Sequence, residues 1–406
     1  MELKLKSYNF NDFSLIYIVF FSIVYQSIVP IGFIFWIALI WVNPVSHPLK
    51  SITQLDRTEF WFIIYYLLLF IGMFWTDNLI FGLSKLENKL CFILFPVLFR
   101  ISKFNLSLKS ILSILIGGLF ISLLVYEFIG LYKTLYYPEI ANSSYFLGLN
   151  FTVFMHRGYY SMYLIVAICI CIYRILNKDR LTTHLFLYFF FAIGSFQTLS
   201  KAGILCFVII HVIYLLYILI NNWKSINIKQ LILLFSVSAI VIVFSVNTVI
   251  VRVNKTLHAI QNIKLENNNS IETNQARLIM WNTSLEVIHE NFFLGTGTGD
   301  YNDELVKKNN HLKNYGVAKS ELNSHNQFLN TFVQIGLLGF LALVLIFYSF
   351  FRAVIKKQKI VLLLIGICFF INFLFESFIE TQSGIILFCI LMTISASSKL
   401  GLQTQK

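Results

Sequence analysis

The sequence predicts an all-α polytopic membrane protein with about twelve transmembrane helices and one large loop outside the membrane. Of its 406 residues, 58% are hydrophobic and 12% are charged, whereas soluble domains carry about 25% charged residues. The mean hydropathy is +0.76, and the apolar residues form runs near the length of about 20 residues that a helix needs to cross a bilayer. An ordinary soluble enzyme is excluded, because the chain has too few polar side chains to cover a surface that faces water.

Twelve apolar runs are candidate spans. They comprise residues 10–25, 28–43, 59–76, 79–99, 110–132, 157–176, 182–197, 202–221, 230–251, 326–351, 358–375 and 379–397. The first two runs could form one helix, but it would be about 50 Å long at 1.5 Å per residue. In addition, Pro30 lacks the backbone N–H that a helix interior needs. We therefore expect a hairpin that breaks between Gln26 and Pro30. Twelve spans place both termini on the same side of the membrane.

The net charge of +12 follows the predicted topology. Most Lys and Arg residues lie at the termini and in alternate loops, whereas the opposite short loops hold Lys133, Arg157 and Lys201. Because short cytoplasmic loops are enriched in Lys and Arg, both termini are predicted to be cytoplasmic. The long outer loop, residues 252–325, contains as many acidic as basic residues. The basic excess is therefore an orientation signal, and we expect no nucleic-acid partner.

These boundaries divide the chain into three regions: a nine-span region at 1–251, the outer loop at 252–325, and a three-span region with a cytoplasmic tail at 326–406. Within the loop, apolar residues recur at steps of three and four between 276 and 291, which predicts an amphipathic helix. They are Leu278, Trp281, Leu285 and Ile288. We expect this helix to lie on the bilayer surface, with Trp281 at the depth of the lipid headgroups.

Neither a metal nor a cofactor is expected. All six cysteines lie in apolar runs, and an isolated Asp300 is too little for a cation site in the loop. The segment 292–301 places three glycines at alternate positions, which suggests a phosphate-binding turn. However, it lacks the last glycine of a dinucleotide fingerprint and the Lys of a P-loop. We favour a tight turn after the helix.

His325 is the candidate catalytic residue. It lies within the polar cluster 323–327, where the outer loop meets the tenth predicted span. Ser324 does not form a hydrolase triad with it, because adjacent side chains point apart and no nucleophile elbow surrounds them.

The run from His325 resembles the signature of bacterial O-antigen ligases. His325-Asn326 is followed after nine residues by Gly336 and after two more by Gly339. Three further segments resemble the same superfamily, which also includes O-antigen polymerases and protein O-oligosaccharyltransferases. They are Arg277 with Trp281 and the glycine-rich segment through Tyr301, Gln197 to Gly203, and Glu376 to Gly384. The resemblance covers roughly residues 150–395.

This resemblance implies a lipid-dependent glycosyltransferase of the GT-C-like architecture. Its donor would be a glycan on undecaprenyl diphosphate, at the periplasmic face of the bacterial inner membrane. His325 would deprotonate the acceptor hydroxyl, and Arg277 would be the second catalytic residue. The diphosphate or glycan contacts would be Arg157, Lys201, Asn326, Tyr301 and Gln197. Lys201 departs from the family pattern, which usually has Arg there, so a bidentate grip on phosphate would become a point-charge contact.

The residues themselves leave several alternatives open. Nearby cations would favour the neutral, proton-accepting form of His325. The acceptor would be lipid A core in a ligase, a second lipid-linked glycan in a polymerase, or Ser or Thr in a protein-glycosylating enzyme. A secondary transporter is a distant alternative, although it predicts inverted repeats and ionisable groups at mid-membrane depth. Glu127 and Glu380 are intramembrane or membrane-edge carboxylates whose roles stay open.

Overall fold

The computed structural model describes residues 9–42, 53–137, 145–221 and 273–397, which are helical and contain no strand. The membrane-protein class is supported because five helical stretches are long and apolar enough to cross a membrane. They are Arg57–Trp75 (α4, Arg57–Ile71, with the short η2, Gly72–Trp75), α7 (Leu108–Tyr136), α8 (Arg157–Leu176), α10 (Lys201–Asn221) and α15 (Gln327–Lys356). Shorter apolar helices are α1 (Phe10–Val24), α2 (Val29–Val42), α9 (Leu181–Gln197), α16 (Ile360–Phe375) and α17 (Gln382–Ala396).

Helices cover most of eleven of the predicted runs, and the run 230–251 lies outside the described residues. The hairpin is confirmed, since a 3-10 turn, η1 (Gln26–Ile28), separates α1 from α2. The run 79–99 differs from the prediction because it contains two helices, α5 (Leu79–Lys89) and α6 (Cys91–Ile101). At their junction the Leu90 N–H donates to the Glu87 carbonyl only three residues back, at 3.2 Å. The count of twelve spans remains a prediction.

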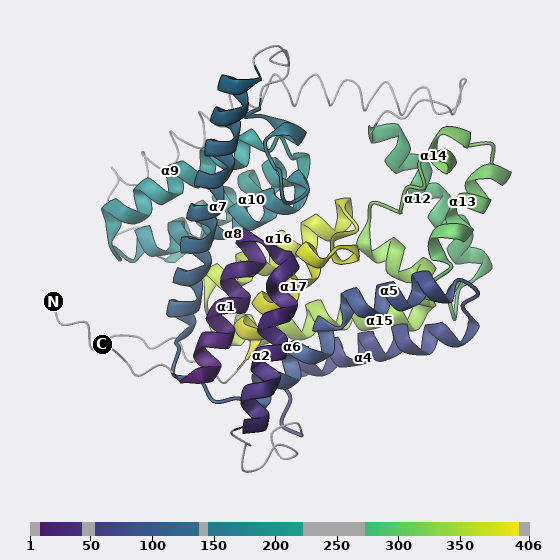
Figure 1. The fold of residues 1–406 in the computed structure, drawn as a ribbon, viewed down its shortest axis with the longest axis horizontal. Helices are drawn as coiled ribbons and strands as arrows, with labels where there is room; N and C mark the ends of the chain where they lie inside the picture. The colour runs from purple at the N-terminus through teal and green to yellow at the C-terminus, as the bar shows by residue number, and fades with distance from the viewer. Residues whose placement is uncertain (1–8, 43–52, 138–144, 222–272, 398–406) are drawn as a thin grey trace.

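The most enclosed candidate span is α8, whose side chains are largely buried. It packs against α9, α10 and α16, and Figure 1 shows α8 and α16 near the middle of the molecule. The long helix α15 packs along α4. Helices α12 (Thr273–Glu290), α13 (Tyr301–His311) and α14 (Tyr315–Lys319), which fall in the predicted outer loop, form a group beside them (Figure 1).

The helix predicted at 276–291 is α12, but the side that it buries in the protein differs from the predicted apolar face. Its buried residues Ala276, Met280 and Val287 pack with the cluster that includes Tyr301 and Leu305. Of the four residues in the predicted face, only Ile288 is buried. Leu285 remains 55% exposed. This side packs against α13 and α15, and it also buries Thr283 and Ser284, whose hydroxyls donate to Asn309 Oδ1 and Ser324 Oγ, both at 2.8 Å. Its position on a bilayer stays a prediction.

The glycine-rich segment is a tight turn that packs into a kink of α15. The kink lies at Ile335 and Gly336, where Gly336 has a φ of +63°. The backbone N–H groups of Thr296 and Gly297 donate to carbonyls just before the kink, at 2.8 and 3.1 Å. Gly295 has a φ of +73°, and a Cβ there would lie 2.5 Å from the Gly336 nitrogen. These glycines therefore join the segment after α12 to the helix that begins beside His325.

Replacing Gly295 by Ala should destabilise the protein by about 1–3 kcal/mol, because the new Cβ meets backbone atoms and the residue is held in a left-handed conformation. Gly117→Ala on α7 is the matched control, since a Cβ there meets nothing within 4 Å. The control should keep or raise the melting temperature, because Ala favours a helix interior. Thermal unfolding of the purified protein in detergent measures both. Equal melting temperatures for the wild type and Gly295→Ala would contradict the packing of this turn.

Candidate functional site

His325 lies directly before α15 and is held in an unusual backbone conformation. Its φ is +44°, a left-handed value that costs a non-glycine residue free energy unless its surroundings enforce it. The His325 N–H donates to Asn323 Oδ1 at 3.0 Å. Asn326 caps α15, because its Oδ1 accepts from the N–H groups of Phe328 and Leu329 at 2.9 and 3.1 Å. The ring is thereby presented at the start of α15, with its side chain 27% exposed.

Glu376 brings His325 and Arg277 together. It follows α16, and its Oε2 lies 3.5 Å from His325 Nδ1 while its Oε1 lies 2.5 Å from Arg277 Nη2. Its side chain is only 13% exposed. The expectation that nearby cations surround the histidine is therefore incomplete, because the residue in direct contact with the ring is a carboxylate. In the sequence, Glu376 stands only at the edge of a segment that resembles the family, and its position at the end of an apolar run was the available signal.

Electrostatic interactions keep this carboxylate ionised. Burial acts to raise the pKa of Glu376, but the hydrogen bond from His325 and the positive charge of Arg277 outweigh it, so the pKa is lowered. A buried carboxylate is retained in the charged form only when such partners compensate for lost water. Glu376 is therefore expected to carry a negative charge at neutral pH.

His156 is a second histidine of this cluster, and no sequence pattern marked it as a candidate. It precedes α8, where its Nδ1 accepts from the Gly158 N–H at 3.3 Å. Removal of water by surrounding side chains lowers the pKa of His156; the Glu376 carboxylate opposes this effect and Arg157 adds to it. Arg157 is the first residue of α8. The start of α8 thus brings an imidazole whose pKa is lowered close to Glu376, with the cation Arg157 next to that imidazole in the chain.

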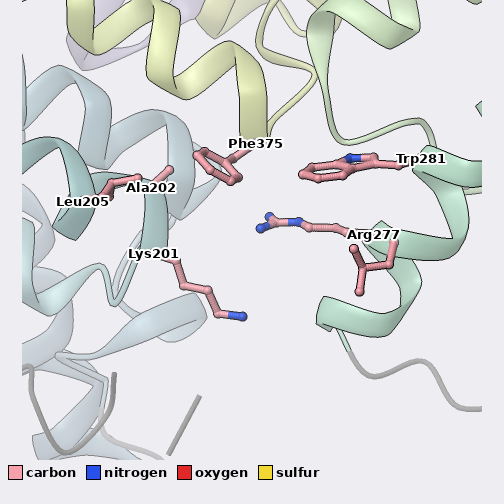
Figure 2. A pocket seen from close by; sticks show the side chains of 7 residues that line it. Lys201, Ala202, Leu205, Arg277, Trp281 and Phe375 are labelled. Carbon is pink, nitrogen blue, oxygen red and sulfur yellow. The ribbon is translucent and has the colours of Figure 1, made fainter. Parts of the chain in front are cut away.

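A pocket of about 280 Å³ opens on the other side of Arg277. Figure 2 shows Lys201 from α10 and Arg277 from α12 extending toward the same space. The rings of Trp281 and Phe375 also border it, with centroids 6.4 Å apart. The remaining lining residues are Ala202, Leu205 and Leu278. The pocket therefore combines two cationic groups with mostly apolar walls, which suits an amphiphilic anion.

Two predicted site residues lie apart from the direct contacts of His325. Gln197 ends α9, and its buried Oε1 has no hydrogen-bond partner among the described residues. Tyr301 is buried, and its hydroxyl donates to Glu380 Oε2 at 3.3 Å. The proposed glycan contacts of Gln197, Tyr301 and Asn326 are not tested by this geometry.

Glu380 belongs to a buried polar network that joins α5, α13 and α15. Lys89 Nζ lies 2.7 Å from Glu380 Oε1, and Lys85 Nζ lies 3.4 Å from Oε2. Gln327 donates to the same carboxylate at 3.2 Å. Lys89 also donates to Gln334 beside the α15 kink, at 3.3 Å. Glu380 is thus a buried ion-pair partner, and its network fixes the helix that begins next to His325.

Glu380→Gln should lower stability by about 3–5 kcal/mol, because it leaves the fully buried Lys89 without its counter-charge. Adding Lys89→Met should restore part of this loss, since the unpaired charge is then removed. Glu304→Gln is the control: its ion pair with Lys307 is exposed, and such pairs contribute at most about 1 kcal/mol. Melting temperatures in detergent give the comparison. A double variant no more stable than Glu380→Gln would contradict this account of the network.

Comparisons with known proteins agree with the resemblance found in the sequence. Residues 185–344 match the family model described as O-Antigen ligase. A protein of Haemophilus influenzae described as uncharacterized is 33% identical over 133 residues, which cover 30% of this chain and 33% of that protein. The match therefore spans about a third of that relative's length. The matched residues 185–344, which include Lys201, Arg277 and His325, are similar to the O-antigen ligase family.

Proposed function

We propose that this protein transfers a glycan from undecaprenyl diphosphate to an acceptor hydroxyl, with His325 as the general base. The family match supports an O-antigen ligase- or polymerase-type glycosyltransferase. One observation carries the finer proposal: Arg277 belongs both to the His325–Glu376 cluster and to the cationic, apolar-walled pocket. The same guanidinium can therefore reach the leaving diphosphate and stand beside the residue that accepts the proton.

The pocket supports a lipid diphosphate as the donor. Its cationic groups, Lys201 and Arg277, would stabilise the charge that develops on the diphosphate as the glycosidic bond breaks. Its aromatic and aliphatic walls would contact the first part of the polyprenyl chain. Arg157, which follows His156 at the start of α8, is a further proposed diphosphate contact. Gln197, Asn326 and Tyr301 are proposed to contact the diphosphate or glycan.

The proposed reaction is a single displacement. The acceptor oxygen attacks the anomeric carbon, the bond from that carbon to the diphosphate oxygen breaks, and the diphosphate leaves with the electron pair. The proton of the acceptor hydroxyl passes to His325. Attack opposite to the leaving group inverts the anomeric configuration. General base catalysis of this kind contributes about 10²–10⁴-fold to the rate.

The membrane setting is part of the proposal. We place the protein in the bacterial inner membrane with twelve spans, both termini cytoplasmic, and the site on the periplasmic side in the GT-C-like architecture. The regions 1–251, 252–325 and 326–406 belong to the same scheme. Lipid A core is the proposed acceptor, with polymerisation or protein glycosylation as variants of the same chemistry. A transporter would use ionisable groups at mid-membrane depth to bind its substrate or ion, whereas we interpret the buried Lys85, Lys89 and Glu380 as structural ion-pair partners.

His325→Ala should reduce glycan transfer by about 10²–10⁴-fold, because the acceptor loses its general base. Transfer is measured in proteoliposomes with a defined lipid-linked glycan and lipid A core, a second lipid-linked glycan, or a protein as competing acceptors. His289→Ala, which alters an exposed histidine on α12, should transfer at the wild-type rate. Wild-type transfer by a correctly inserted His325→Ala protein would remove His325 from the mechanism.

A charge series at Lys201 tests the cation at the pocket rim. Lys201→Arg should keep or improve transfer, whereas Lys201→Ala should reduce it by about 10–100-fold, the effect of losing one hydrogen bond to a charged group. Lys307→Ala, at an exposed position on α13, controls for loss of surface charge. Steady-state rates at several concentrations of the lipid donor give the comparison. Equal rates for all of these variants would show that Lys201 only anchors the helix.

A further inference from the structure

We propose that Glu376 is a positioning residue that sets which nitrogen of His325 accepts the proton and holds Arg277 at the rim of the pocket. This inference rests on the proposed function, since it assigns a role beside a base. Its starting observation is that one carboxylate faces two partners, with Oε1 toward Arg277 Nη2 and Oε2 toward His325 Nδ1.

The chemistry of the contact selects the tautomer of the histidine. An ionised carboxylate only accepts hydrogen bonds, so the His325 nitrogen that faces Glu376 must carry its proton. In a neutral imidazole the other nitrogen, Nε2, is then the acceptor. The separation of 3.5 Å is long for a hydrogen bond, but catalytic hydrogen bonds are often long before substrate binds and shorten afterwards. Glu376 therefore directs Nε2 toward the acceptor hydroxyl.

The surrounding backbone holds the two side chains in register. Asn323 Oδ1 accepts both the His325 N–H and the Ser377 hydroxyl, at 3.0 and 3.1 Å. The Ser377 carbonyl in turn accepts from the Tyr159 hydroxyl at 3.3 Å. Asn323 thus connects the residue before α15 to the residue after Glu376. This connection limits how far the imidazole and the carboxylate can separate.

The charges around the ring define what Glu376 contributes during the reaction. The charged and titratable groups of this cluster are Glu376 after α16, Arg277 on α12, and His156 with Arg157 at the start of α8. Glu376 is the acidic member. When His325 takes the proton, the carboxylate stabilises the imidazolium, while Arg277 remains available to the departing diphosphate. The Glu376 carboxylate thereby positions both the His325 imidazolium and the Arg277 guanidinium in the transition state.

The test compares Glu376→Gln with Glu376→Asp in the full-length protein, reconstituted with the lipid-linked glycan and an acceptor. Gln keeps the shape of the side chain but removes its charge, so Nδ1 of His325 no longer has to carry a proton. In the serine protease triad, the corresponding loss of control over the histidine tautomer lowers kcat by up to about 10⁴-fold. We expect Glu376→Gln to lower kcat by at least about tenfold, with KM for the lipid donor changed by less than about threefold. Glu286→Gln, on the partly exposed surface of α12, should leave both unchanged.

The pH profile separates positioning from simple packing. In Glu376→Gln the rising limb of the rate against pH should move to lower pH, because the imidazolium loses a neighbouring negative charge. Glu376→Asp keeps that charge, so it should retain the wild-type limb with a reduced kcat. If Glu376→Gln does not fold, the pH profile of Glu376→Asp is the test. A rising limb displaced from that of the wild type in Glu376→Asp would overturn the inference.

The outcomes also distinguish this inference from the proposed function. Transfer lost in His325→Ala but unchanged in Glu376→Gln, in both kcat and pH profile, would overturn the role of Glu376 and leave His325 as the base. Transfer unchanged in both variants would overturn the proposed function itself. A reduced kcat with a displaced limb in Glu376→Gln, together with inactive His325→Ala, supports both.

Discussion

The account depends on the interaction of one carboxylate, Glu376, with both Arg277 and His325. These three residues come from α12, from the turn before α15 and from the break after α16. A buried carboxylate is costly unless cations and hydrogen bonds compensate for the water it has lost. The compensating contacts hold α12 against the segment after α16 and the turn before α15. The same contact that satisfies Glu376 therefore assembles the site and borders the pocket.

A second constraint keeps α15 in place. The buried Glu380 network contacts Gln327, in the first turn of α15, and Lys89 of that network reaches Gln334 at the kink. The glycine turn at Gly295 packs on that kink. Because His325 directly precedes the helix, these contacts fix the direction from which its ring enters the site. The buried Glu380 and Lys89 thus stabilise the position of α15 beside the proposed site.

Hydropathy predicted most of the helices, because an apolar run forms a buried helix whether lipid or protein surrounds it. Pro30 likewise identified the hairpin, and His325 stood out as a polar residue at a membrane junction. Glu376 and His156 could not be paired from the sequence, because they meet only through packing of α8 against α16. The side of α12 that packs on α13 and α15 could not be predicted either, because it includes small and polar residues whose partners hydropathy alone does not reveal.

Determining the structure of the protein with bound undecaprenyl diphosphate tests the central claim most directly. The account predicts that the diphosphate lies between Lys201 and Arg277, within hydrogen-bond distance of the guanidinium, and that the lipid chain runs over Phe375 and Trp281. It also predicts that His325 faces the end of the diphosphate where a glycan would be attached. A diphosphate bound away from both cations, with the lipid chain outside this pocket, would contradict the account.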